Sequence, residues 1–121
     1  MKPATLLLVA AFGSAAVAQP TGGFPPTSVA ATAQDLSAHL SGKTFNAAYA
    51  DGTRVQTKFG SDGDLFASAP GFTDSGKWRV EEGKLCGSLR KIGEFCNEAR
   101  FDAGTLYLRR MNGEVVRYVP N

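Results

Sequence analysis

The chain contains little of the residue chemistry on which most enzymes and metal sites depend. Its 121 residues include one histidine, two cysteines and one tryptophan. His39 is the only histidine, and a metal site around it would need ligands scattered through the predicted sheet, so we expect no metal site. A G-x-S-x-G elbow, an H-E-x-x-H motif and a phosphate-cradling glycine loop are all absent. The sequence therefore predicts a protein that is not an enzyme and has no cofactor.

One acid–base option remains, because carboxylates lie close together in two places. Asp62 is near Asp64, and Glu81 precedes Glu82. Each pair flanks a predicted turn, where carboxylates usually serve solubility or the turn itself. We expect these four residues to have structural roles.

The chain also lacks a strong excess of either charge. It has 13 basic and 11 acidic residues. Removing residues 1–18 removes Lys2 alone, which leaves 12 minus 11, a net charge of +1. A dedicated nucleic-acid-binding protein would show a basic excess or stripe, so we expect no nucleic-acid partner.

No hydrophobic run reaches the roughly 20 residues that a membrane-spanning helix needs, but the N-terminus has a shorter one. Met1-Lys2 precedes an apolar run, residues 6–12, and small residues ending in Ala16-Val17-Ala18. This pattern is typical of a secretory signal peptide, and we place cleavage after Ala18. The residue directly after Ala18 is Gln19 and not a cysteine, so we expect no lipid anchor. The mature chain should be periplasmic or secreted, monomeric and not inserted in the membrane.

Residues 19–29 follow as a predicted flexible lead-in, because three prolines and two glycines lie between Gln19 and Pro26. The remaining residues, 30–121, are enough for one domain. In an oxidising compartment the two cysteines indicate a disulfide, Cys86 to Cys96. The C-x9-C spacing lacks the C-x-x-C geometry of redox-active pairs, so we expect a structural bond.

The first element that the sequence predicts in this domain is a short helix over residues 30–40. Leu36 and Leu40 are four residues apart and share a face that can pack on a sheet or close one end of a barrel. Thr32, three residues before Asp35, is a suitable N-cap, and Gly42 suits a left-handed position just after the helix.

Beyond the helix, apolar and polar residues alternate, and turn signals recur every eight to twelve residues. Asp51-Gly52, Asp62-Gly63 and Asn112-Gly113 are strong hairpin signals. We predict a mainly β fold, an eight-stranded antiparallel meander barrel that is lipocalin-like, with one N-terminal helix and one disulfide. We prefer a barrel to an open sandwich because closure removes exposed edges. The predicted strands are residues 44–50, 54–59, 64–69, 77–82, 84–90, 95–101, 105–111 and 114–119.

The alternation predicts an interior in which aromatic side chains face small ones. The large inward residues are Phe45, Tyr49, Phe59, Trp78, Leu85, Phe95, Phe101 and Leu108, and the small ones are Ala47, Thr57, Gly87 and Ala99. Native packing density makes a filled interior the default. The alternative is a cavity between Trp78 and the aromatic wall, in which Phe45, Tyr49, Phe59, Phe95, Phe101 and Arg110 are further candidate ligand-binding residues.

Arg109 and Arg110 are adjacent, so on one strand they would point to opposite faces. Strict alternation would place Arg110 at the inner mouth of the barrel. A strand end that lets both side chains reach water is the alternative, and we favour it. If Arg110 does point inward, it indicates a site for an anionic ligand or an internal ion pair.

The stretch from Gly76 to Cys86, together with Leu40-Ser41-Gly42-Lys43-Thr44 and Cys96, resembles a group of small secreted proteins of Gram-negative bacteria. The resemblance covers most of residues 35–118 and rests on a Gly-x-Trp strand, a Gly-x-Leu-Cys strand and a second cysteine. That group is a domain of unknown function, so the resemblance implies a fold and a compartment but no site.

Two better-understood families are also similar in part. Gly76-Lys77-Trp78 resembles the Gly-x-Trp signature of lipocalins, although theirs opens the first strand. Periplasmic inhibitors of c-type lysozyme are small disulfide-bonded barrels that present a serine and a lysine from neighbouring loops. That resemblance implies roles for Ser41 with Lys43 and for Ser75 with Lys77.

We therefore expect a non-catalytic periplasmic binding or interaction module. One alternative is an inhibitor of lysozyme or a related wall hydrolase. Another is a carrier of a small apolar or amphipathic anionic ligand. In each case the partner is an unidentified protein or small molecule.

Overall fold

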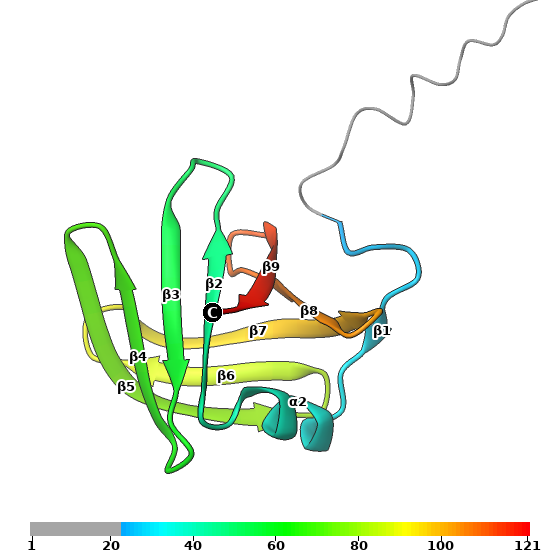
Figure 1. Ribbon diagram of the computed structural model, residues 1–121, viewed down its shortest axis with the longest axis horizontal. Helices are drawn as coiled ribbons and strands as arrows, with labels where there is room; N and C mark the ends of the chain where they lie inside the picture. The colour runs from blue at the N-terminus through cyan, green and yellow to red at the C-terminus, as the bar shows by residue number, and fades with distance from the viewer. Residues whose placement is uncertain (1–22) are drawn as a thin grey trace, which may run out of the picture.

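The structure, a computed structural model, describes residues 23–121, and the predicted signal peptide and its cleavage site lie outside them. Figure 1 shows a sheet that curls on itself, with a short helix at one end. The elements are β1 (Val29–Ala30), α2 (Ala33–Leu40), β2 (Lys43–Ala48), β3 (Arg54–Phe59), β4 (Asp64–Ala69), β5 (Phe72–Glu81), β6 (Lys84–Leu89), β7 (Gly93–Asp102), β8 (Thr105–Arg109) and β9 (Val115–Pro120). Among these elements no helix is long and apolar enough to cross a bilayer.

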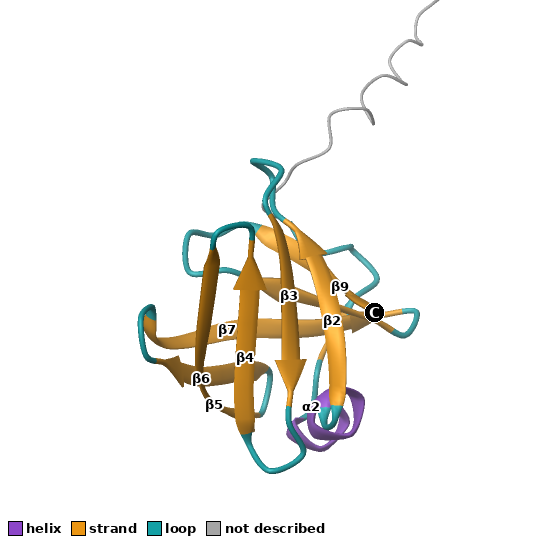
Figure 2. Cartoon of the chain, turned by 60° about the vertical axis from the view of Figure 1, so that its left-hand side comes forward, coloured by secondary structure: helices purple, strands orange, loops and turns teal. Residues whose placement is uncertain are grey.

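Strands β2 to β9 form the predicted closed, eight-stranded antiparallel barrel. Each strand pairs with the next along the chain, and β9 returns to β2 through Phe45↔Pro120 and Asn46↔Val119. The predicted turns bring the strands together, because Gly52, Gly63 and Gly113 all have positive φ angles, which glycine adopts without strain. The tight connections are visible at both ends of the barrel (Figure 2).

Helix α2 covers one end of the barrel, as the spacing of its leucines predicts. Leu36 and Leu40 are completely buried, and the helix contacts β2 and β5. Thr32 caps the helix, because its Oγ1 accepts a hydrogen bond from the Asp35 backbone N–H at 3.1 Å. Gly42 follows the helix with φ +76°, as predicted. The helix starts at residue 33 rather than 30, because Val29 and Ala30 pair with β7 instead.

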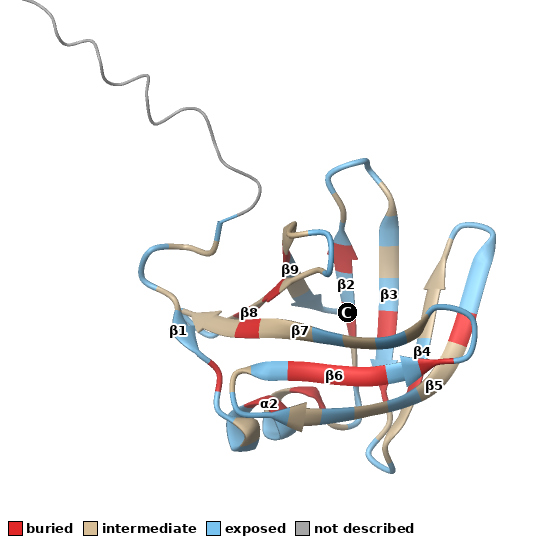
Figure 3. Cartoon of the chain, turned by 180° about the vertical axis from the view of Figure 1, so that it is seen from behind, coloured by how far each residue is buried: buried red, intermediate tan, exposed pale blue. Residues whose placement is uncertain are grey.

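The predicted disulfide joins Cys86 to Cys96 across the β6–β7 hairpin. The two residues are direct partners in the strand register, which places Gly87 opposite Phe95. A Cβ built on Gly87 would lie 2.8 Å from Cζ of Phe95, so the ring occupies the space that the glycine leaves. Cys86 lies in the buried stretch of β6, shown red in Figure 3.

Strand β5 is longer than the alternation indicated, and it includes residues 72–76, which were expected in a loop. Ala69 pairs directly with Phe72, so Pro70 and Gly71 form a two-residue turn. Strand β5 therefore begins at Phe72, five residues before the predicted start at Lys77. Sequence reasoning missed this because Asp74 and Gly76, which interrupt the segment, belong to residue types that are depleted in strands.

The segment before the helix is attached to the barrel over its described part. Val29 and Ala30 pair with Phe101 and Arg100 of β7. The Thr27 hydroxyl donates to Asp102 at 2.6 Å. The Phe24 ring makes cation–π contacts with Arg100 and Arg109, whose Cζ atoms lie 4.7 and 4.8 Å from the ring centroid. Part of the predicted flexible lead-in, residues 19–29, therefore contacts the barrel. The cause is long-range pairing that local composition does not reveal.

Asp74 fixes the β6–β7 turn against β5. Its buried carboxylate accepts hydrogen bonds from the backbone N–H groups of Ser75, Lys91 and Ile92, at 2.9 to 3.1 Å. Burial alone would raise the pKa of Asp74, but the N–H groups of Ile92, Lys91 and Ser75 hold that pKa below its usual value. The charged form is thus stabilised in the folded state.

We expect Asp74→Asn to lower the melting temperature by several degrees near neutral pH, because an amide nitrogen would face backbone donors. A folded-state pKa that is depressed contributes stability above the ordinary carboxyl pKa, and the contribution is lost as pH falls through the folded value. The difference from wild type should therefore shrink in acid. Thermal denaturation at a series of pH values measures it. Glu94→Gln removes an exposed carboxylate from the same hairpin and is the control; a difference that persists undiminished in acid would contradict this role.

Candidate functional site

The barrel is hollow at the end away from α2, where it encloses a cavity of about 580 Å³. The cavity opens between the turns that join β2 to β3, β4 to β5, β6 to β7 and β8 to β9. Its lining comprises Tyr49, Thr53, Val55, Thr57, Phe59, Leu65, Ala67, Ser68, Ala69, Pro70, Phe72, Leu85, Leu89, Ile92, Phe95, Asn97, Leu108, Arg110, Met111, Asn112, Val116 and Tyr118. Most of these residues are apolar. The volume lies within the range of ~300–1,000 Å³ that is usual for small-molecule sites.

The hollow arises because two neighbouring strands carry small inward residues. Val55 and Thr57 of β3 lie beside Ala67 and Ala69 of β4, and Thr57 is the register partner of Ala67. These side chains do not reach across the barrel, and the aromatic residues on the opposite wall do not fill the gap. The expectation of a filled interior thus fails for this half of the barrel.

The half of the barrel nearest α2 is filled as predicted. Phe45 and Phe59 are almost completely buried, and the Phe59 ring meets Trp78 edge to face at 5.4 Å between centroids. Trp78 also donates its indole N–H to the Gly60 carbonyl at 2.9 Å. Phe101 packs against His39, with 5.0 Å between ring centroids. Phe59 forms part of the floor of the cavity, and the rest of this cluster packs beneath that floor.

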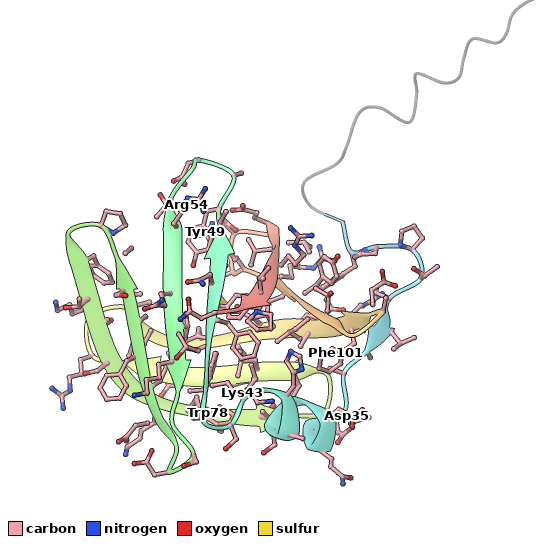
Figure 4. The ribbon with its side chains drawn as sticks, viewed as in Figure 1. Asp35, Lys43, Tyr49, Arg54, Trp78 and Phe101 are labelled. Carbon is pink, nitrogen blue, oxygen red and sulfur yellow. A yellow bond between two sulfur atoms is a disulfide. The ribbon has the colours of Figure 1, made fainter. Side chains whose placement is uncertain are left out.

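Figure 4 shows Tyr49 at the open end of the barrel and Trp78 toward the helix end. Of the candidate ligand-binding residues, the cavity therefore brings together Tyr49, Phe59, Phe95 and Arg110. The other three are not among its lining residues. Phe45, Trp78 and Phe101 belong to, or pack against, the solid core.

Arg110 lines the cavity, as strict alternation predicts, and its side chain, which is 31% exposed, also reaches water just beyond the end of β8. Its Cζ lies 3.6 Å from the centroid of the Tyr49 ring. Its Nη1 forms a 2.5 Å ion pair with Oε1 of Glu114. The other Glu114 oxygen accepts from the Ala50 backbone N–H at 2.5 Å. Arg109, by contrast, pairs with Glu98 on the outer surface.

Further polar side chains lie in the wall of the cavity. The Tyr118 hydroxyl is hydrogen-bonded to the Thr57 side chain, and burial raises the pKa of Tyr118 to about 12, so this pair is uncharged near neutral pH. Burial likewise raises the pKa of Tyr49, although Arg110 opposes that shift. Asn97 contributes an amide whose buried Oδ1 has no hydrogen-bond partner within residues 23–121.

The rim of the cavity carries exposed apolar side chains. Phe72, Ile92 and Met111 come from three different turns or strand ends and are 38%, 59% and 73% exposed. The Lys91 ammonium lies over the Phe72 ring at 5.3 Å. The apolar surface of the cavity thus continues outward to solvent.

The residues to which the lysozyme-inhibitor resemblance gave roles do not lie in two adjacent loops. Ser75 and Lys77 lie within strand β5, and Lys77 pairs with Asp64 at 2.5 Å. Ser41 and Lys43 lie at the junction of α2 and β2, below the closed end.

The paired carboxylates serve turns, ion pairs and a helix end, as their positions indicated. Asp62 accepts from the Asp64 backbone N–H at 3.1 Å, within the β3–β4 turn. Glu82 accepts from the Ala33 N–H at the start of α2, also at 3.1 Å. Glu81 pairs with Arg79.

Two positions bear on metal binding. Within residues 23–121 the one close group of possible ligands is Glu81 with the two cysteines, whose sulfurs are bonded to each other. His39 lies between Phe45 and Phe101, where burial and then Lys43 lower its pKa.

Sequence reasoning missed Asn97, Glu114 and the rim. Asn97 shares the inward parity of Phe95 and Ala99, so alternation could have identified it. The contact of Glu114 with Arg110 follows from the tight β8–β9 turn, in which the two residues are four apart.

The chain matches no protein-family profile, and no curated protein is significantly similar to it.

Proposed function

We propose that this protein is a non-catalytic binding module that holds one small apolar or amphipathic molecule in its barrel. The observation that carries the proposal is the cavity itself, which is large, mainly apolar and open at one end. Leaving so much apolar wall unfilled is unfavourable for folding, because the lining loses its packing partners. A bound molecule would restore those contacts.

Two further features support binding over surface recognition. The exposed Phe72, Ile92 and Met111 surround the opening and give an apolar ligand a continuous path from solvent to the interior. The floor is rigid, because Trp78, Phe59 and Phe45 are packed and hydrogen-bonded beneath it. A preformed cavity of this kind binds without the cost of reorganisation.

The compartment remains part of the proposal. The disulfide supports an oxidising environment, in which such bonds persist. We infer export to the periplasm from this bond together with the signal-peptide pattern of residues 1–18.

The test is a titration with N-phenyl-1-naphthylamine, an uncharged fluorophore that emits strongly in apolar surroundings. We expect a saturable increase in its emission with one molecule bound per chain. Ala67→Phe should weaken binding at least tenfold, because the added ring would project into the cavity from β4.

Ala48→Phe adds the same ring to the exposed face of β2 and should leave the affinity unchanged. Circular dichroism would establish that both variants keep the β fold. A linear, unsaturable response, or equal binding by wild type and Ala67→Phe, would rule the cavity out as the binding site.

A further inference from the structure

The open end of the barrel contains charge, but that charge is already balanced. Arg110 and Glu114 form an ion pair at 2.5 Å, and both residues are partly buried. Each Glu114 oxygen has a donor, one from Arg110 and one from the Ala50 N–H. The Tyr49 ring covers a face of the guanidinium. An incoming carboxylate would therefore have to compete with Glu114 for Arg110.

Arg110 is also the only residue with a charged side chain among those that line the cavity in the described part of the chain. Every other polar side chain in the lining is uncharged, and Thr57 and Tyr118 satisfy each other. Asn97 differs, because its Oδ1 has no hydrogen-bond partner among the described residues, 23–121. A half-turn of that amide exchanges Oδ1 and Nδ2, so the group can offer an acceptor or a donor to the cavity.

We propose that the ligand is an uncharged amphiphile that carries a hydroxyl or amide group, and not an organic anion such as a fatty-acid carboxylate. This inference rests on the proposed function and specifies its ligand class. An ionised carboxylate placed in this cavity would lose its hydration without gaining a free cation, which is strongly unfavourable. A hydroxyl group would lose less and could pair with the Asn97 amide.

The test compares decan-1-ol with decanoate by isothermal titration calorimetry, at concentrations below aggregation. The two ligands have the same number of carbon atoms and differ in the head group. We expect decan-1-ol to bind wild type at least tenfold more tightly. Equal or tighter binding of decanoate would overturn the inference.

Glu114→Gln provides a gain-of-function arm. The glutamine keeps an oxygen for the Ala50 N–H but removes the charge that balances Arg110. We expect decanoate to bind this variant at least tenfold more tightly than it binds wild type, while decan-1-ol changes less than twofold. Glu98→Gln, which removes a carboxylate from the outer face, is the matched control and should alter neither ligand. An unchanged decanoate affinity in Glu114→Gln would contradict charge balance as the cause.

Asn97→Leu tests the hydroxyl contact with a residue of similar size. We expect decan-1-ol to bind about fivefold more weakly, which is the effect of losing one neutral hydrogen bond. The control is Asn46→Leu, on the exposed face of β2. Undiminished binding of decan-1-ol to Asn97→Leu would remove Asn97 from the site. The outcomes also separate the two proposals, since saturable binding of N-phenyl-1-naphthylamine without preference for the alcohol overturns the ligand class alone.

Discussion

Gly76→Ala is expected to lower the free energy of unfolding by more than about 3 kcal/mol. Gly76 lies in β5, where it pairs with Leu65 on one side and Leu89 on the other. A Cβ at this position would overlap the Ser88 carbonyl oxygen and lie 2.8 Å from its carbonyl carbon and 2.9 Å from the Leu89 Cα. All three atoms belong to the backbone of β6, so no side chain can move aside. The methyl group would force the two strands apart.

Urea denaturation followed by Trp78 emission measures this effect, because Trp78 is the only tryptophan and lies on the same strand. Gly23→Ala is the matched control, since nothing lies within 4 Å of a Cβ there. The same substitution should be almost neutral at that position. A loss below about 1 kcal/mol for Gly76→Ala would mean that β5 and β6 are not in close contact.

Removing the disulfide is the second large effect. The double variant Cys86→Ala, Cys96→Ala is expected to lose about 3 kcal/mol of stability, because the bond closes a loop of 11 residues, counting both cysteines, and restricts the unfolded chain. The loss of the buried Cys86 side chain adds to that entropic effect. Equilibrium urea denaturation of wild type and variant gives the difference directly.

A reductant supplies the control for this second experiment. Wild type in excess dithiothreitol should approach the stability of the double variant, whereas the variant itself should not respond. If the denaturation midpoint of wild type is the same with and without reductant, the disulfide does not stabilise the fold.

The barrel could be predicted because its strongest signals are local. An Asp-Gly or Asn-Gly pair determines a hairpin within a few residues, as at Gly52 and Gly113, and period-two alternation then assigns each side chain to a face. The cysteine pair fixed the register of β6 against β7. Strand β1 could not be predicted, because Val29 and Ala30 pair with residues about 70 positions later.

The site was less predictable, because a hollow depends on volumes summed around the ring of strands. Alternation identified Thr57 as small and inward, but not that Ala67 lies directly beside it. Arg110 lies just beyond the end of β8, so it both lines the cavity, as alternation predicts, and remains partly exposed to water. Its contact with Tyr49 depends on how β2 closes against β9, which no local pattern contains.

Helix α2 covers one end of the barrel, and this limits the route by which a bound molecule could exchange with a molecule in solvent. With Leu36 and Leu40 sealed beneath the aromatic floor, a molecule must leave by the opening through which it came. Exchange is then strictly sequential, because a second molecule gains access only after the first has departed. If the barrel holds a ligand as proposed, the four turns at the open end would control both its uptake and its release, and a partner that covers them would trap the ligand rather than displace it.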